Sequence, residues 1–371
     1  MPLVDRYLGK EILLPFAAGL LFLTQLLLAT QLLNQADVLF GSGVALLDVA
    51  AILVALMPHV LGYVLPIAFL LGAVLGVGRL AEDREVVALG AAGVSPARLV
   101  RVPLALGVVA AALGLWLSLS LEPAGLSAAR VRLNEVVKRN VTNDVRAGTF
   151  YDQIPGYTVY TERVRDGRWE NVLISDRSDP GAPVLALARA GRLEPVGVGQ
   201  EMQLVLDGGE LHREDAEAGE YVTAQFRHAE LVIGLGTALT DRNALARTAK
   251  EMDVAAMQAR IAAERARGDA AQARRFEGYL HRRIAQPLAV IPFALLAVPL
   301  GASRRIGRGF AVAATLLAVV AHYVLLRGGE VLAQKGALPA ALALQLPTLV
   351  LSAVALALVV QQARRGVGAV R

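Results

Sequence analysis

Residues 78–96, GRLAEDREVVALGAAGVSP, decide how this chain is organised, because they place four consecutive charged residues, Glu82 to Glu85, between two apolar runs. The run before them is LVALMPHVLGYVLPIAFLLGAVLGVG (53–78), and the run after them is LVRVPLALGVVAAALGLWLSLSL (99–121). A helix of about 20 apolar residues crosses the hydrocarbon core of a bilayer. The charged stretch is therefore predicted to connect two membrane spans.

The composition of the whole chain agrees with a membrane protein. Of its 371 residues, 55% are hydrophobic, whereas a soluble domain has about 45–50%. It contains no cysteine, which excludes disulfides and thiolate-bound metals. The first apolar run, from Ile12, lacks a small-residue cleavage site, so we expect a retained membrane helix and not a cleaved signal.

Six runs are long enough to be membrane spans. We place them near residues 12–33, 52–77, 99–121, 284–302, 309–327 and 339–361. The fourth contains Pro287, Pro292 and Pro299. Because neighbouring helices can satisfy the carbonyls that a proline frees, this span is predicted to lie inside a bundle.

The short loops differ in their content of basic residues, which predicts orientation, because cytoplasmic loops are enriched in Lys and Arg. Twelve basic residues lie in the N-terminal segment, the loops after spans 2 and 4, and the C-terminal tail: Arg6, Lys10, Arg79, Arg84, Arg98, Arg101, Arg304, Arg305, Arg308, Arg364, Arg365 and Arg371. The loops after spans 1 and 5 contain only two, Arg327 and Lys335. Both termini and residues 78–98 are therefore expected to be cytoplasmic, and the long insert between spans 3 and 4 to lie outside.

This insert, residues 122–283, has the pattern of a β-domain flanked by helices. YTVYTERV and WENVLISDR alternate apolar and polar residues around Asp166-Gly167, which predicts a hairpin. QLVLDGGELHRE predicts a second hairpin around Asp207-Gly208-Gly209. Short strands with such turn signals predict an antiparallel sandwich or jelly roll. Asp253 and Asp269 are predicted to cap two helices that lead into span 4.

The predicted fold class is thus a polytopic α-helical membrane protein, three spans plus three, with an inserted antiparallel β-domain. We divide it into residues 1–121 (spans 1–3, with a cytoplasmic helix at about 79–95), 122–283 (the β-domain and its flanking helices) and 284–371 (spans 4–6 and the tail). In span 2, Gly72, Gly76 and Gly78 are expected to permit close helix packing.

Several catalytic motifs are absent from the sequence. It contains no GxxxxGK[ST] phosphate loop, no HExxH and no GxSxG. Its five histidines are scattered, without a pattern of metal ligands or a nucleophile with its base. We therefore expect no catalysis, no cofactor and no metal site.

Ionisable residues deep in spans would indicate an ion path, and this sequence has almost none, which disfavours proton-coupled transport. Gln31 and Asn34 lie near the outer end of span 1, and Arg327 at the outer edge of span 5. The amides fit interhelical hydrogen bonds, and Arg327 fits a side chain extending to the interface. Alternatively, Arg327 is a cation that faces a cavity binding an anionic head group, and Gln31 and Asn34 are further candidate substrate-binding residues.

The charged stretch also has two interpretations. Glu82, Asp83 and Glu85 in a first helical turn would interact favourably with the helix dipole, and Gly93 and Pro96 would end that helix. The second interpretation is a coupling helix that inserts into a separate cytoplasmic ATPase, with one carboxylate paired to a basic residue there. The absence of a phosphate loop and of an ion path makes this stretch the best candidate for energy input.

Three motifs resemble the LptF/LptG permeases (the YjgP/YjgQ family) of the lipopolysaccharide exporter, and with the three-plus-three layout the resemblance covers essentially the whole chain. The motifs are DRYLGKEIL, LPIAFLLGAVLGVGRLAEDREVVALGAAGVSP and LHRRIAQPLAVIPFALLAVPLG. IPGYTVYTERV, VLISDRSDPGAPVLALARAGRLEP and GGEVLAQKGALP look more like the F-type subunit.

The resemblance implies a bacterial inner-membrane permease that pairs with a homologous six-span subunit (LptG-like) on a cytoplasmic ABC ATPase dimer (LptB-like). Such a complex extracts lipopolysaccharide and passes it through periplasmic β-jelly-roll domains to a bridge protein (LptC-like); no nucleic acid is involved. The family's coupling glutamate falls on Glu85, with Glu82 as second choice. Some members carry a lysine in span 1 where this chain has Gln31 and Asn34, which puts a direct phosphate contact from this span in doubt.

A different class of function remains as the alternative. The chain would then be a membrane-anchored scaffold or receptor, whose external β-domain binds a periplasmic partner without transport. Six spans with several prolines exceed what an anchor needs.

Overall fold

The computed structural model describes residues 2–34, 45–144, 147–154, 156–165, 168–177, 183–196, 201–215, 220–233, 249–302 and 308–365. The chain divides into two compact units. The helical unit comprises Met1–Ala29, Leu56–Leu126 and Ala249–Arg371, and the β unit comprises Thr30–Ala55 and Ser127–Thr248.

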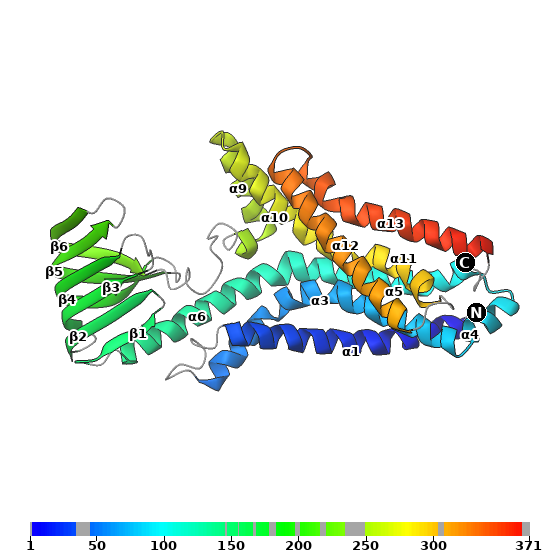
Figure 1. The fold of residues 1–371 in the computed structure, drawn as a ribbon, viewed down its shortest axis with the longest axis horizontal. Coiled ribbons are helices and arrows are strands. Elements are labelled where there is room, and N and C mark those ends of the chain that lie inside the picture. Colours follow the sequence, from blue (N-terminus) through cyan, green and yellow to red (C-terminus); the bar gives the residue numbers. More distant parts are fainter. Residues whose placement is uncertain are drawn as a thin grey trace. The chain divides into compact units, whose positions relative to one another are not determined.

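The helices confirm the predicted six spans (Figure 1). The first half of the chain holds α1 (Pro2–Asn34), α3 (Leu46–Glu82), α4 (Glu85–Ala91), α5 (Pro96–Trp116), the π-helical turn η1 (Leu117–Leu121) and α6 (Glu122–Asp144). The second half holds α9 (Val254–Ala266), α10 (Ala270–Leu288), α11 (Val290–Gly301), α12 (Arg308–Gln334) and α13 (Ala340–Arg365). Six of these helices, with α10 and α11 counted as one and α5 continued through η1 into α6, are long and apolar enough to cross a membrane.

The second and fourth spans form the centre of the helical unit. In both, 72% of the most apolar window is buried, against 17–33% in the other four spans. The fourth span, α10 with α11, contacts α5, α12 and α13. The prediction that the proline-containing span lies inside a bundle is therefore confirmed.

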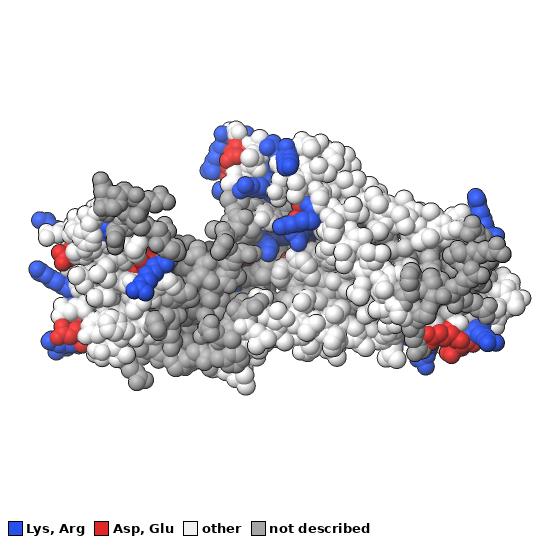
Figure 2. Space-filling view, viewed as in Figure 1, with Lys and Arg blue, Asp and Glu red and all other residues white. Residues whose placement is uncertain are grey.

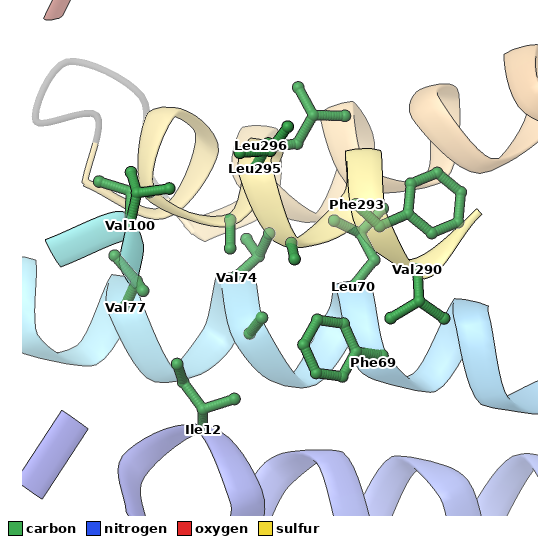
Figure 3. Close-up of a cluster of buried hydrophobic side chains, with 14 of the residues drawn as sticks. Ile12, Phe69, Leu70, Val74, Val77, Val100, Val290, Phe293, Leu295 and Leu296 are labelled. Atoms are coloured by element: carbon green, nitrogen blue, oxygen red, sulfur yellow. The ribbon is translucent and has the colours of Figure 1, made fainter. Parts of the chain in front are cut away.

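A continuous hydrophobic cluster joins these helices (Figure 3). Leu70 and Val74 of α3 lie toward Val290 and Phe293 of α11, and Ile12 of α1 lies on the other side of α3. This packing fixes the two central spans against each other and against the first span.

Two glycines bring α1 and α3 into backbone contact. A Cβ at Gly72 would lie 2.4 Å from Phe16 Cα, and one at Gly76 would lie 2.5 Å from the Glu11 carbonyl oxygen. Any larger residue at either position would force the helices apart. The expected close packing along span 2 is thus confirmed at Gly72 and Gly76.

The predicted antiparallel β-domain is confirmed, and it consists of one six-stranded sheet. The strands are β1 (Phe150–Ile154), β2 (Tyr157–Arg165), β3 (Arg168–Asp176), β4 (Val184–Val196), β5 (Glu201–Asp215) and β6 (Glu220–Ile233). They pair in chain order as a meander, and the sheet is not closed. A buried cluster around Trp169, Val172 and Ile174 lies on the sheet.

Of the two predicted hairpins, the first is confirmed and the second is wrong. Arg165 pairs with Arg168, so Asp166-Gly167, which lies outside the described residues, is the whole connection between β2 and β3. At Asp207-Gly208-Gly209, however, β5 continues, and its register with β4 and β6 is unbroken.

Gly208 and Gly209 of this second motif lie inside strand β5, where the backbone conformation and packing require glycine. Gly208 has φ 64°, and a Cβ at Gly209 would lie 2.0 Å from the Leu187 carbonyl oxygen of the neighbouring strand. A positive φ and a close backbone approach both favour glycine. The same residues that indicate a turn therefore indicate a kinked strand.

The two helix caps predicted before span 4 are present in the structure. The Asp253 carboxylate accepts a hydrogen bond from the Ala256 amide at 2.6 Å, and the Asp269 carboxylate accepts one from the Gln272 amide at 2.9 Å. These caps start α9 and α10 as predicted.

Candidate functional site

The stretch 78–96 forms a break between two spans, followed by a short helix. The span helix α3 runs through Glu82, and α4 starts only at Glu85. Arg84 between them has φ 61°, a left-handed conformation that stops α3. The expectation that Glu82, Asp83 and Glu85 share one first turn is therefore wrong, because Glu85 alone opens α4. Gly93, with φ 83°, follows the end of α4, as predicted, and Pro96 is the first residue of α5.

α4 has one buried residue, Val86, and one charged residue, Glu85 at its start. Val86 is 2% exposed and belongs to the same hydrophobic cluster as Leu8 and Leu80. Glu85 is partly buried, and its Oε1 accepts a hydrogen bond from the Tyr7 hydroxyl at 3.1 Å. Glu82 is exposed at the end of α3. Both predicted coupling carboxylates thus lie at the junction of α3 and α4.

A second contact joins the first two spans nearby. The Arg79 guanidinium lies 3.4 Å from a Glu11 carboxylate oxygen. Arg79 is 65% exposed, so solvent weakens this ion pair. The start of α1, α4 and the end of α13 lie together at one end of the helical unit, which we call the α4 end (Figure 1).

The predicted substrate-binding residues lie on two helices. Gln31 and Asn34 are in the last turn of α1, and Arg327 lies in α12. Arg327 is 75% exposed and forms an ion pair with Glu330, one turn further along the same helix. Their contact with a lipid stays a prediction.

The opposite end of the helical unit contains a buried polar cluster that sequence analysis missed. His59 Nδ1 of α3 lies 2.7 Å from Glu122 Oε1, and the Ser118 hydroxyl donates to Glu122 Oε2 at 2.9 Å. Glu122 is 8% exposed. Ser118 lies in η1, whose wider π-helical turn directly precedes Glu122. Such turns inside α-helices often occur at functional sites.

Arg282 and Arg283 of α10 extend this polar cluster. The Arg282 guanidinium lies 2.8 Å from a carboxylate oxygen of Glu330, which is itself 7% exposed.

Arg283 holds the segment by which the chain returns to the bundle. It is 6% exposed, and it donates hydrogen bonds to the carbonyls of Met252 at 2.6 Å, Ala249 at 2.9 Å and Lys250.

A small cavity of about 20 Å³ lies among these residues, enough for about one water molecule. Its lining comes from three helical regions and the return segment: Tyr63, Ser118, Glu122, Lys250, Tyr279, Arg282, Arg283 and Gln286. Glu122 and Glu330 each have an ionisable partner, and Arg283 donates to backbone carbonyls; buried charges need such partners. The contacts of this cluster join α3, α6, α10 and α12.

The sequence pattern does not reveal this cluster, for a definite reason. Glu122, Arg282 and Glu330 each lie at the edge of an apolar run, where a charged residue is ordinary. The pairs His59 with Glu122 and Arg282 with Glu330 join different helices that are far apart in sequence. The proximity of these charged side chains becomes visible only when the helices are packed. Among the described residues, no group of three or more His, Cys, Asp or Glu could hold a metal ion.

Six apolar helices with an inserted antiparallel sheet, and a short helix between the second and third spans, define a polytopic membrane protein with an extramembrane β-domain. The family model for the lipopolysaccharide export system permease LptF/LptG matches residues 6–361. The chain belongs to this family, as the three motifs predicted. A search of the curated proteins finds no match to the chain.

Proposed function

We propose that this chain is the F-type permease subunit of an ABC-type exporter that extracts lipopolysaccharide from the bacterial inner membrane and passes it to a periplasmic bridge protein. The observation that carries the proposal is the family match over residues 6–361, which includes the spans, α4 and the β-domain. The chain itself acts as a non-catalytic transport subunit.

The energy comes from a separate cytoplasmic ATPase dimer. The sequence has no phosphate loop of its own. α4 is the part of the α4 end that suits a partner, because Val86 anchors it while Glu85 and Glu82 remain at the surface junction. A basic residue of the ATPase pairing with Glu85 would give this contact direction and specificity.

We infer that the chain is oriented in the membrane with its α4 end in the cytoplasm. Basic residues of the short loops concentrate on the side that holds α4 and both termini. On the face drawn in Figure 2, charged side chains gather at the α4 end and around α9 and α10, and the helix surface between them is largely uncharged. This apolar band suits the hydrocarbon core. The β-domain is then periplasmic, and residues 1–121, 122–283 and 284–371 serve as the membrane, periplasmic and membrane parts.

The permease works as a pair with a homologous six-span subunit. Its apolar outer surface supports this, because α1, α12 and α13 expose many large side chains, among them Phe22, Leu317 and Leu349. Lipid and a second permease both fit such a surface. The substrate would be contacted by Gln31, Asn34 and Arg327.

The proposal is tested with the purified permease pair and ATPase in proteoliposomes loaded with lipopolysaccharide. Glu85→Ala should assemble and hydrolyse ATP, yet release at least about tenfold less lipopolysaccharide per ATP, because a charge-assisted contact contributes about 1.5–3 kcal/mol. Asp83→Ala, in the neighbouring turn, is the matched control and should keep the wild-type ratio. Full export by Glu85→Ala would contradict the coupling role.

A second measurement separates transport from anchoring. Photo-crosslinkers at positions 31 and 34 should capture lipopolysaccharide, and a control at exposed Leu349 should not. If no ATPase and no second six-span subunit co-purify in mild detergent, the scaffold function replaces the transport function.

A further inference from the structure

The side chain of Glu85 is hydrogen-bonded to Tyr7 in the first span helix, 78 residues earlier in the chain. The Tyr7 hydroxyl donates to Glu85 Oε1 at 3.1 Å on the exposed surface of the α4 end. The residues next in sequence, Leu8 of α1 and Val86 of α4, are each 2% exposed and belong to one hydrophobic cluster. The hydrogen bond between α1 and α4 therefore lies next to residues by which both helices enter the same buried cluster.

α1 is a single helix of 33 residues, which at 1.5 Å per residue is about 50 Å long. Its first half is held to α3 at Gly72 and Gly76 through backbone contacts. Its last turn holds Gln31 and Asn34. A displacement applied near Tyr7 therefore acts on a continuous helix that reaches the predicted substrate residues.

A carboxylate can accept several hydrogen bonds at once. Glu85 can thus keep Tyr7 on one oxygen while it accepts a cationic side chain from a partner. The exposed position of the Tyr7 contact leaves the carboxylate within reach of such a partner.

We propose that Tyr7 is a positioning residue that orients the Glu85 carboxylate and ties it to α1, so that engagement of Glu85 by the ATPase moves the first span together with α4. This inference rests on the proposed function, because it assigns the route by which the coupling contact reaches the membrane. The link is the hydrogen bond between Tyr7 and Glu85, supported by the burial of the neighbouring Leu8 and Val86 in one hydrophobic cluster.

The test uses Tyr7→Phe in the full complex, reconstituted with its ATPase and lipopolysaccharide. Phenylalanine keeps the ring and removes the hydroxyl. The expected result is about threefold to tenfold less lipopolysaccharide released per ATP, with ATP hydrolysis and complex assembly unchanged. In a Glu85→Ala background, Tyr7→Phe should have no further effect, since both changes remove one link.

Glu11→Gln is the matched control. It weakens the neighbouring contact between α1 and Arg79 but leaves Glu85 untouched, so its release per ATP should equal the wild-type value. A loss shared by Glu11→Gln and Tyr7→Phe would overturn the specific role of Tyr7.

The outcomes separate the two claims. If Glu85→Ala uncouples but Tyr7→Phe exports like the wild type, the inference about Tyr7 is wrong and the proposed function stands. If Glu85→Ala itself exports normally, the coupling role of Glu85 fails first. A lowered unfolding temperature of Tyr7→Phe that accounts for its lost export would likewise overturn the positioning role.

Discussion

The two ends of the helical unit are held together in opposite ways. At the opposite end from α4, His59 and Glu122 lie 2.7 Å apart, and Arg282 and Glu330 lie 2.8 Å apart, with both carboxylates largely buried. At the α4 end the interhelical polar contacts are longer, 3.1 Å for Tyr7 and Glu85 and 3.4 Å for Arg79 and Glu11, and they are exposed.

This difference indicates a division of roles. Buried, paired charges are costly to break, because removing one partner leaves the other uncompensated. Exposed contacts contribute little to stability and exchange readily with a partner's groups. The end with the buried polar cluster is therefore built to hold its geometry, and the α4 end to accept a partner.

The largest effect is expected for Arg283→Ala. Three carbonyls of the returning chain would lose their donor, and unsatisfied buried carbonyls cost about 1–3 kcal/mol each, partly recovered by water. We expect a loss of about 3 kcal/mol, measured as a lower unfolding midpoint in detergent. Arg275→Ala, at an exposed position of the same helix, should change the midpoint little; equal effects would break the comparison.

A smaller loss is expected at the α1–α3 contact. Gly72→Ala places a Cβ against the Phe16 backbone, and such overpacking costs about 1–3 kcal/mol. Gly62→Ala on the same helix meets nothing within 4 Å and should stabilise by about 0.5–1 kcal/mol. Unfolding midpoints of the two variants should thus move in opposite directions, and a midpoint of Gly72→Ala at or above wild type would show that α1 is not held there.

The buried pair should show coupling in a double-mutant cycle. Glu122→Gln and His59→Gln each remove one partner of the 2.7 Å contact, and their combination should cost less than the sum by about 1–2 kcal/mol. Midpoints of the two single variants and the double variant provide the measurement. Additive effects would mean that the two side chains do not stabilise each other.

The smallest effect is expected for Arg79→Ala at the α4 end. The ion pair with Glu11 is exposed, so its loss should cost less than about 0.5 kcal/mol. A cost comparable to that of Arg283→Ala, read from the same unfolding midpoints, would remove the distinction between the ends.

Sequence analysis predicted those features that depend on local pattern. Apolar runs located the six spans, Asp166-Gly167 located the β2–β3 connection, and Asp253 and Asp269 located two helix starts. The prediction was wrong where one local sequence pattern is compatible with two structures. Gly208 and Gly209 fit a turn and a kinked strand equally well, and the neighbouring strand decides between them.

The same limit applies to the site. The motif around α4 identified Glu85 and Glu82, but the left-handed Arg84 that separates them has no signal in the residue types. The Tyr7 contact and the pairing of His59 with Glu122 depend on how helices pack, so a single sequence cannot show them.

The central claim is that the α4 end receives the ATPase, and cysteine crosslinking tests it most directly because the chain has no cysteine. Single variants Glu82→Cys and Glu85→Cys, co-expressed with the ATPase, would be treated with a short thiol-to-amine crosslinker. Lys335→Cys, exposed at the opposite end, is the control. Crosslinks to the ATPase from positions 82 and 85 and none from 335 are predicted. A crosslink from 335, with none from 82 or 85, would contradict the account.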